Sequence, residues 1–430
     1  MTAPPRGRAV RVPSSRVSRL AGFGSMTTGV AGNALVEGAK RLSRGERPAL
    51  RDLVLTPQNV RRVTDELARM RGAAMKLGQL ISMDGGDVLP RELSDLMARL
   101  RAEADFMPPK QLRTVLTESW GVGWHKRFES FDVARTRDGR DLAIKVQYPG
   151  VARSIDSDID NVVSLIRLAG LAPQGLNLDP LVAEAKRQLA EEADYALEAE
   201  NLKRFAKALG PTPGFSMPEV QDDLTAPTVL AMTRVAGGPL EAAETLPQDA
   251  RDAIATRLLT LTLREIFEFT LMQSDPNFAN YRYDADTGTL GLLDFGAVRP
   301  LPAGLAKDYA RLLRAGLSDD FAGVEKAAED IGLLSARTAP QHRRVILAMM
   351  RDVLAVMLKD DLYDFGRTDI VALLRDHGMA LAGDPGFADV PPVDVLYLQR
   401  KVAGMYLICR TLRARVQLRA LLEDLVPRAV

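Results

Sequence analysis

The spacing of apolar and polar residues divides the chain into a helical first third, a short region with strands and a long, mostly helical remainder. Apolar positions recur with helical period in 59–80, 90–104 and 110–120. Short apolar runs at 133–136 and 142–147 predict strands, and Asp138-Gly139 between them predicts a hairpin turn. A further strand is expected at 228–233 and a short apolar run lies at 290–295. Helical spacing in the rest predicts helices over 157–168 and 179–209 and one amphipathic helix over 396–422.

Length and composition place the chain among soluble globular proteins. Its 430 residues suggest two to three domains. The apolar fraction of 46% and the charged fraction of 26% are sufficient for a core and disfavour widespread disorder. The single cysteine excludes an internal disulfide framework and any Cys₂ or Cys₄ zinc site, and the scatter of the three histidines disfavours a His-rich metal site. No uninterrupted apolar stretch is long enough for a transmembrane helix.

The charge is unevenly distributed. The net charge of +1 gives no reason to expect nucleic acid as a partner. Residues 1–50, however, hold nine basic and two acidic residues, so this segment carries +7 and the remainder −6. Small residues between the basic runs suggest a close-packing helix that touches anionic lipid. An ordinary flexible tail followed by an ordinary helix explains the same pattern.

Four features that bear on chemistry occur in a fixed order. They are Lys145 at the end of an apolar strand, an acidic helix that contains Glu198, the segment 274–280 with Asp275 and Asn280, and the tripeptide Asp294-Phe295-Gly296. Each alone has a simpler explanation: a solvated strand edge, a solvated helix face or a turn. Together, in this order, they match a protein kinase. In kinases a strand lysine contacts the phosphates and a helix glutamate holds that lysine. A loop Asp serves the reacting group, and an Asn and a second Asp bind Mg²⁺.

These motifs resemble the UbiB/AarF family of atypical kinases, in particular its mitochondrial ubiquinone-biosynthesis branch. The family's KxGQ motif falls on Lys76-Leu77-Gly78-Gln79, and its ExD motif falls on Glu192-Ala193-Asp194. Further matches are 104–108, 145–151 and 272–277. The resemblance extends from about residue 16 to about residue 300 and more faintly beyond.

The resemblance implies a role for each matching residue. Lys145 would contact phosphate and Glu198 would be its helix partner. Asp275 would be the catalytic-loop aspartate, and Asn280 and Asp294 the Mg²⁺ ligands. Lys76 and Gln79 would belong to a helical extension that covers the pocket, with Glu192 and Asp194 as its polar partners.

The expected fold class is α+β: a bilobal, protein-kinase-like fold with a truncated small lobe that contains the strands, a large helical lobe and an N-terminal helical extension that carries KxGQ. The expected domains are the basic segment 1–50, the extension 51–120, the N-lobe 121–235 and the C-lobe 236–430.

One departure from the family concerns the nucleotide loop. The family has an Ala-rich loop before the lysine strand, the counterpart of the Gly-rich loop that covers the phosphates in kinases. Here 128–132 runs directly into 133–139, and the loop is missing. Its absence removes backbone N–H donors from the phosphate cradle. We therefore expect weaker or altered nucleotide binding.

Three functions follow as alternatives. The first is an atypical kinase or ATPase that uses ATP (or ADP) and Mg²⁺ and supports ubiquinone biosynthesis at a membrane surface. The second is a non-catalytic pseudokinase scaffold or lipid-binding protein. The third, a conventional protein kinase, is disfavoured because HRD, the Gly-rich loop and an APE-like element are missing. The implied partners are ubiquinone-biosynthesis enzymes, polyprenyl lipid precursors and an anionic membrane surface. We expect a bacterial-type chain without a transit peptide, cytoplasmic and peripheral at the inner membrane.

Overall fold

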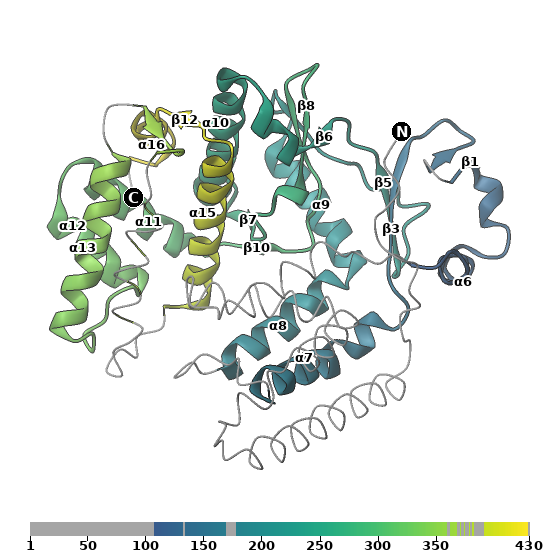
Figure 1. The fold of residues 1–430 in the computed structure, drawn as a ribbon, viewed down its shortest axis with the longest axis horizontal. Coiled ribbons are helices and arrows are strands. Elements are labelled where there is room, and N and C mark those ends of the chain that lie inside the picture. The colour runs from purple at the N-terminus through teal and green to yellow at the C-terminus, as the bar shows by residue number, and fades with distance from the viewer. Residues whose placement is uncertain are drawn as a thin grey trace, which may run out of the picture. The chain divides into compact units, whose positions relative to one another are not determined.

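The computed structural model describes residues 107–428, apart from 132–133, 169–177, 359–361 and most of 368–390 (Figure 1). The basic segment 1–50, most of the predicted extension, Lys76 and Gln79 lie outside the described residues. The chain divides into two compact units. Of the described residues, the first unit contains 107–140, 144–196 and 222–231, and the second contains 141–143, 197–221 and 232–428.

The first unit begins with helix α6 (Pro109–Trp120), which has Pro109 in its first turn and ends at Gly121. Proline is tolerated there because a backbone N–H in the first turn would have no acceptor within the helix. A short 3₁₀ turn (Trp124–Arg127) leads into strand β1 (Phe128–Ser130). The rings of Trp120, Trp124, Phe128 and Phe131 pack together with centroids 4.8–6.5 Å apart. Both tryptophans are therefore packing residues.

The strands around the predicted hairpin pair differently from the prediction. The turn forms at Asp138-Gly139, with Gly139 at φ +90° and its N–H donating to the Thr136 carbonyl. Strand β2 (Arg135–Thr136), however, pairs with β1, and β3 (Leu142–Val146) pairs with β5 (Val229–Thr233). The predicted pairing is wrong because each strand finds a partner outside the turn.

Two helices, α7 (Val151–Leu168) and α8 (Leu178–Glu192), pack against each other in the first unit. The predicted single helix over 179–209 is interrupted: α8 ends at Glu192, and α9 (Tyr195–Leu209) begins three residues later. Asp194 immediately precedes α9, the position before a helix at which aspartate is favoured. The ExD motif therefore lies at a helix break.

The second unit contains a four-stranded sheet in the order β4-β9-β8-β6. Its strands are β4 (Phe215–Ser216), β6 (Gly238–Pro239), β8 (Tyr281–Asp284) and β9 (Thr289–Leu292). A separate antiparallel pair joins β7 (Leu271–Gln273) to β10 (Val298–Pro300). These strands fix both ends of the segments that hold the predicted catalytic residues.

Helices make up most of the second unit. They are α10 (Gln248–Arg264), a π-helical turn (Glu265–Phe269), α11 (Ala303–Leu317), α12 (Phe321–Ile331), α13 (Pro340–Met357), α15 (Val393–Thr411) and α16 (Leu418–Leu425), with 3₁₀ turns at Leu240–Thr245 and Phe278–Asn280. The predicted helix over 396–422 is two helices. Arg413 at φ +48° ends the first, and β12 (Arg415–Val416) pairs with β11 (Tyr363–Asp364) before α16.

Apolar side chains from these elements form the core of the second unit. One cluster joins Ile266 and Met272 to Leu398 of α15, and a second joins α11, α12 and α15 around Val395. Among the described residues, no helix combines the length and apolar character needed to cross a membrane.

Candidate nucleotide and metal site

The predicted catalytic aspartate follows directly after a buried strand. Strand β7 ends at Gln273, and the Ser274 N–H donates to the Ala297 carbonyl at 2.8 Å. The Asp275 side chain is 26% exposed, and its Oδ1 accepts a hydrogen bond from Arg400 Nη2 at 2.8 Å. The carboxylate is thus held in place while remaining accessible.

Asn280 folds back onto the same loop. Its Nδ2 donates to the Asp275 carbonyl at 2.8 Å and lies 3.4 Å from Asp275 Oδ2. The Leu293 N–H donates to the Asn280 carbonyl at 3.0 Å, so this loop is tied to the residue that precedes Asp294. The spacing of five residues between Asp275 and Asn280 corresponds to a closed loop.

Asp294 follows strand β9 in a tight turn. Its Oδ1 accepts from the Gly296 N–H at 3.0 Å. Phe295 is buried, with its ring centroid 5.1 Å from that of Phe205, and its carbonyl accepts from Asn201 Nδ2 at 3.2 Å. The Asp-Phe-Gly turn is therefore anchored to α9, the helix that carries Glu198.

A glutamine joins the two loops. Gln273 Nε2 donates to the Asp275 carbonyl at 3.0 Å and to the Asp294 carbonyl at 3.3 Å. Two features predicted separately from the sequence, the segment with Asp275 and Asn280 and the tripeptide that begins at Asp294, are therefore brought together in the second unit.

The remaining predicted residues are distributed over both units. Lys145 is half-buried on β3 in the first unit, and Glu198 is buried on α9 in the second. Glu192 is half-buried at the end of α8, and Asp194 is exposed in the helix break. Because Lys145 and Glu198 belong to different units, their pairing stays a prediction.

The matching segment after Lys145 contacts the ExD motif. Gln147 Nε2 donates to the Ala193 carbonyl at 2.5 Å, and the Gln147 N–H donates to the Thr228 carbonyl at 2.9 Å. Gln147 therefore links the end of β3 to the break between α8 and α9 within the first unit.

Helix α15 contributes residues that the sequence analysis missed. Besides Arg400, the next residue, Lys401, forms an ion pair with Glu265 at 3.0 Å, and both side chains are 1% exposed. Burial raises the pKa of the Glu265 carboxyl. Burial also opposes the charge of Lys401, but the neighbouring Glu265 and Tyr281 together outweigh it and leave the pKa of the lysine above its usual value. The available signal in the sequence was the pair of adjacent cations, Arg400 and Lys401, in a mostly apolar helical segment.

The same helix approaches the catalytic loop very closely. A Cβ at Gly404 would lie 2.1 Å from Pro276 Cγ and 2.5 Å from Pro276 Cβ. Only glycine allows this contact between α15 and the residue after Asp275.

The small lobe offers a short connection where the nucleotide loop was expected. Strand β1 ends at Ser130 and β2 begins at Arg135, so four residues link them. Ala134 has φ +44°, and its N–H donates to the Phe131 carbonyl at 3.2 Å. Four residues are too few for the Ala-rich loop that the resemblance implies.

The oxygen atoms of Asn280 and Asp294 fit Mg²⁺, which takes one or two carboxylates and completes its coordination with water and substrate phosphates. In the described part of the chain, no group of three or more His, Cys, Asp or Glu side chains could hold a metal by itself. A metal at this site would therefore depend on phosphate oxygens as well. The cavity beside Gln273, Asn280 and Asp294 is about 10 Å³, far smaller than a nucleotide.

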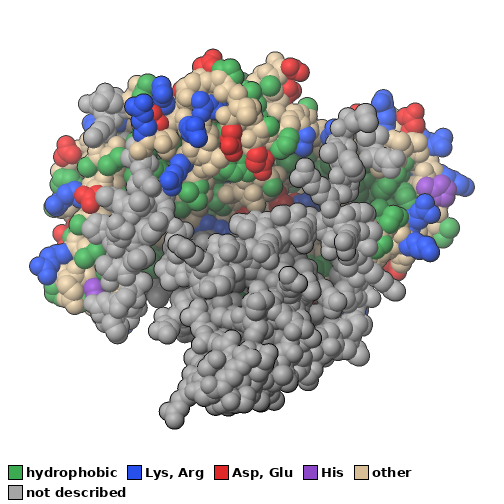
Figure 2. Space-filling view, in the orientation of Figure 1, with side chains coloured by type: hydrophobic (Ala, Val, Ile, Leu, Met, Phe, Trp, Pro, Cys, Tyr) green, Lys and Arg blue, Asp and Glu red, His purple; other side chains and the backbone are tan. Residues whose placement is uncertain are grey.

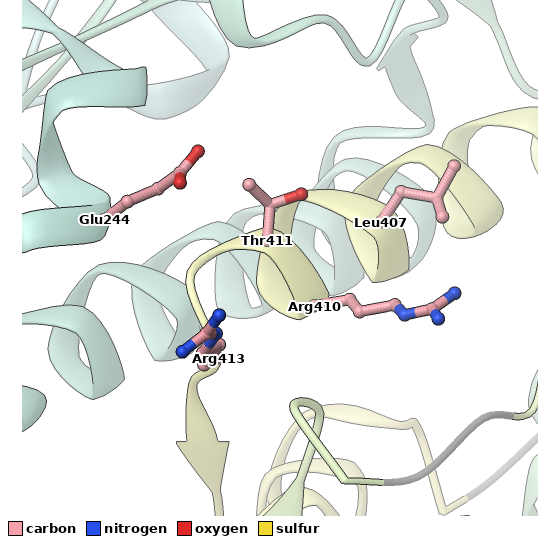
Figure 3. A pocket seen from close by; sticks show the side chains of 5 residues that line it. All are labelled: Glu244, Leu407, Arg410, Thr411 and Arg413. Atoms are coloured by element: carbon pink, nitrogen blue, oxygen red, sulfur yellow. The ribbon is translucent and has the colours of Figure 1, made fainter.

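A larger surface pocket lies elsewhere in the second unit. It measures about 450 Å³ and lies between the 3₁₀ turn Leu240–Thr245 and the C-terminal end of α15 (Figure 3). Its lining residues are Glu244, Leu407, Arg410, Thr411 and Arg413. None of them belongs to the predicted catalytic or metal-binding set.

Known proteins resemble this chain over most of its length. The mitochondrial atypical kinase COQ8B of Danio rerio is 33% identical over 97% of this chain and 70% of its own length. The mitochondrial atypical kinase COQ8 of Saccharomyces cerevisiae is 31% identical over 96% and 85%. A solved structure, the Rv3197–erythromycin complex from Mycobacterium tuberculosis, superposes with a TM-score of 0.59 at 25% identity, covering 84% of this chain and 94% of that one.

The expected location is contradicted by these relatives. The zebrafish, yeast, nematode and rat proteins are named as mitochondrial proteins of eukaryotes. The expectation of a bacterial-type cytoplasmic chain at the inner membrane, based on the lack of a recognisable transit peptide, is therefore wrong.

The family model of the ABC1 atypical kinase-like domain matches residues 99–328. This range contains the lysine strand, the ExD break and both loops of the site. The match and the structural likeness confirm the predicted α+β, kinase-like fold class. The chain belongs to the ABC1 atypical kinase-like family.

Proposed function

We propose that the chain binds ATP with Mg²⁺ and hydrolyses it, and that this activity supports ubiquinone biosynthesis at a membrane surface. The observation that carries the proposal is the convergence of Asp275, Asn280 and Asp294 on two loops joined by Gln273. The ubiquinone link comes from the resemblance and from relatives named COQ8.

Each residue has a defined part in this proposal. Asn280 and Asp294 would hold Mg²⁺, which neutralises charge on the phosphates. Lys145 would contact phosphate oxygens, with Glu198 as its counter-ion. Asp275, oriented by Arg400, would accept a hydrogen bond from the attacking water.

The short link between β1 and β2 favours a second candidate, a pseudokinase scaffold that binds nucleotide weakly or not at all. The two candidates differ in one measurable property, Mg²⁺-dependent turnover of ATP.

The membrane part of the proposal is supported by the +7 charge of residues 1–50. On the face shown in Figure 2, basic and acidic side chains are interspersed over the described elements. We assign contact with anionic lipid to the N-terminal segment because of its charge.

Steady-state ATP hydrolysis by Asp294→Asn tests the catalytic proposal. We expect turnover to fall by about 100-fold or more, because the substitution removes the negative charge that Mg²⁺ needs. Asp284→Asn is the matched control, since Asp284 Oδ1 accepts from the Asp286 N–H at 3.1 Å in the same kind of turn. Equal background turnover in the unmodified protein and in Asp294→Asn would favour the pseudokinase.

A further inference from the structure

Gln273 lies where the two loops of the site meet. Its side chain is buried, and its Nε2 is the only atom of the side chain that has hydrogen-bond partners among the described residues. The partners are the carbonyls of Asp275 and Asp294, one from each loop. A single amide group therefore spans the catalytic and the metal-binding loop.

The orientation of this amide is fixed by its partners. Carbonyl oxygens only accept hydrogen bonds, so the NH₂ group of Gln273 must face them. Its Oε1 consequently points away and is buried without a partner in the described part of the chain. An unpaired buried acceptor opposes folding. An apolar side chain would avoid this penalty but would also lose the two loop contacts that the amide makes.

The backbone of Gln273 is also fixed, by a hydrogen bond to Glu265. Its N–H donates to Glu265 Oε2 at 3.1 Å, while Glu265 is paired with Lys401 of α15. Both charged groups are almost completely buried, and a buried pair of this kind holds its geometry firmly as long as both partners are present. Helix α15 is thus connected through Glu265 and Gln273 to both loops.

We propose that Gln273 is a positioning residue that sets the separation between the Asp275 loop and the Asp294 loop, and that the Glu265–Lys401 pair holds Gln273 in register. The effect of Gln273 on the binding of Mg²⁺-ATP rests on the proposed function. The coupling of the two loops by Gln273 does not.

Hydrogen exchange in the unliganded full chain tests the coupling directly. Gln273→Met keeps the length of the side chain and removes its donors. We expect backbone amides in 274–283 and in 290–297 to exchange faster together, on the order of tenfold, while α11 and α12 are unchanged. Gln273→Asn, whose amide is one methylene shorter, is expected to show the same paired change to a smaller extent.

Gln248→Met is the matched control. Gln248 Nε2 also donates twice, to Asp252 Oδ1 at 2.7 Å and to the Arg413 carbonyl at 2.9 Å, but outside the site. Gln248→Met should leave amide exchange in both loops at the rates of the unmodified protein. Unchanged exchange in the 290–297 segment of both Gln273 variants, or an equal effect of Gln248→Met, would overturn the proposal.

A second readout separates this inference from the proposed function. In a Mg²⁺ titration at fixed ATP, Gln273→Met should require about tenfold more Mg²⁺ for half-saturation, with ATP binding in the absence of Mg²⁺ unchanged. If the unmodified protein binds no Mg²⁺-ATP, the proposed function fails, and the hydrogen-exchange result still decides the coupling.

Discussion

The carboxylate of Asp275 is held by a side chain from a distant part of the chain. Arg400 lies 125 positions away and donates to its carboxylate, with only 8% of the arginine side chain exposed. A well-oriented carboxylate matters because small misplacements of a reacting group reduce rates strongly. Arg400 is therefore a positioning residue for the proposed water attack.

Arg400→Met should reduce the turnover of ATP by about 10- to 100-fold while the dissociation constant for Mg²⁺-ATP stays within about threefold, because binding uses other residues. Arg400→Lys should restore part of the turnover, since it keeps a donor near Asp275. Arg343→Met, which breaks pairs with Glu325 and Glu329, is the control. Equal losses of binding and turnover in Arg400→Met would contradict the positioning role.

The sequence predicted Asp275, Asn280 and Asp294 because their spacing and order are local properties. It missed Arg400, Lys401 and Glu265, because their partners are set by how α15 packs in the second unit. Periodicity along a helix indicates which face is buried, but it does not identify the loop that this face meets.

Helix α15 is the element that links the C-terminal part of the chain to the site. It carries Arg400, Lys401 and Gly404, which contact Asp275, Glu265 and Pro276 respectively. Its predicted length was wrong, because apolar spacing continued through the Arg413 turn into α16. The break between α8 and α9 was missed for the same reason: helix formers surround Ala193-Asp194 on both sides.

Gly404→Ala should displace the catalytic loop, because Pro276 has no flexible side chain that could move aside. We expect a loss of stability of about 1–3 kcal/mol by overpacking, together with a larger reduction in turnover than in Mg²⁺-ATP binding. Gly304→Ala in the first turn of α11 is the control, since a Cβ there meets nothing within 4 Å. Thermal unfolding and steady-state kinetics of both variants provide the comparison, and a Gly404→Ala protein with unchanged stability and turnover would argue against the close contact.

The near-neutral total charge of the chain is the sum of a basic N-terminal segment and an acidic remainder. An electrostatic attraction to anionic lipid would be confined to residues 1–50 and would weaken with salt. The family assignment and the site geometry concern the rest of the chain, so membrane binding and catalysis can be tested separately.

Replacing Arg6, Arg8, Arg11, Arg16 and Arg19 by glutamine in the full chain should abolish co-flotation with vesicles that contain anionic lipid. Each basic residue near the surface contributes about 1 kcal/mol, so the five changes together remove most of the attraction. ATP turnover should stay unchanged. Undiminished flotation of this variant at low salt would remove the segment from the membrane proposal.

We propose that the chain with its short β1–β2 link still binds Mg²⁺-ATP, and a thermal-shift titration of the full chain is a direct test. A ligand that binds only the folded state stabilises it by about 2.7 kcal/mol at 100 times its dissociation constant. We predict a melting temperature that rises with ATP concentration in the presence of Mg²⁺, and an increase that disappears with a chelator or in Asp294→Asn. A melting temperature independent of Mg²⁺-ATP in the unmodified protein would contradict the claim.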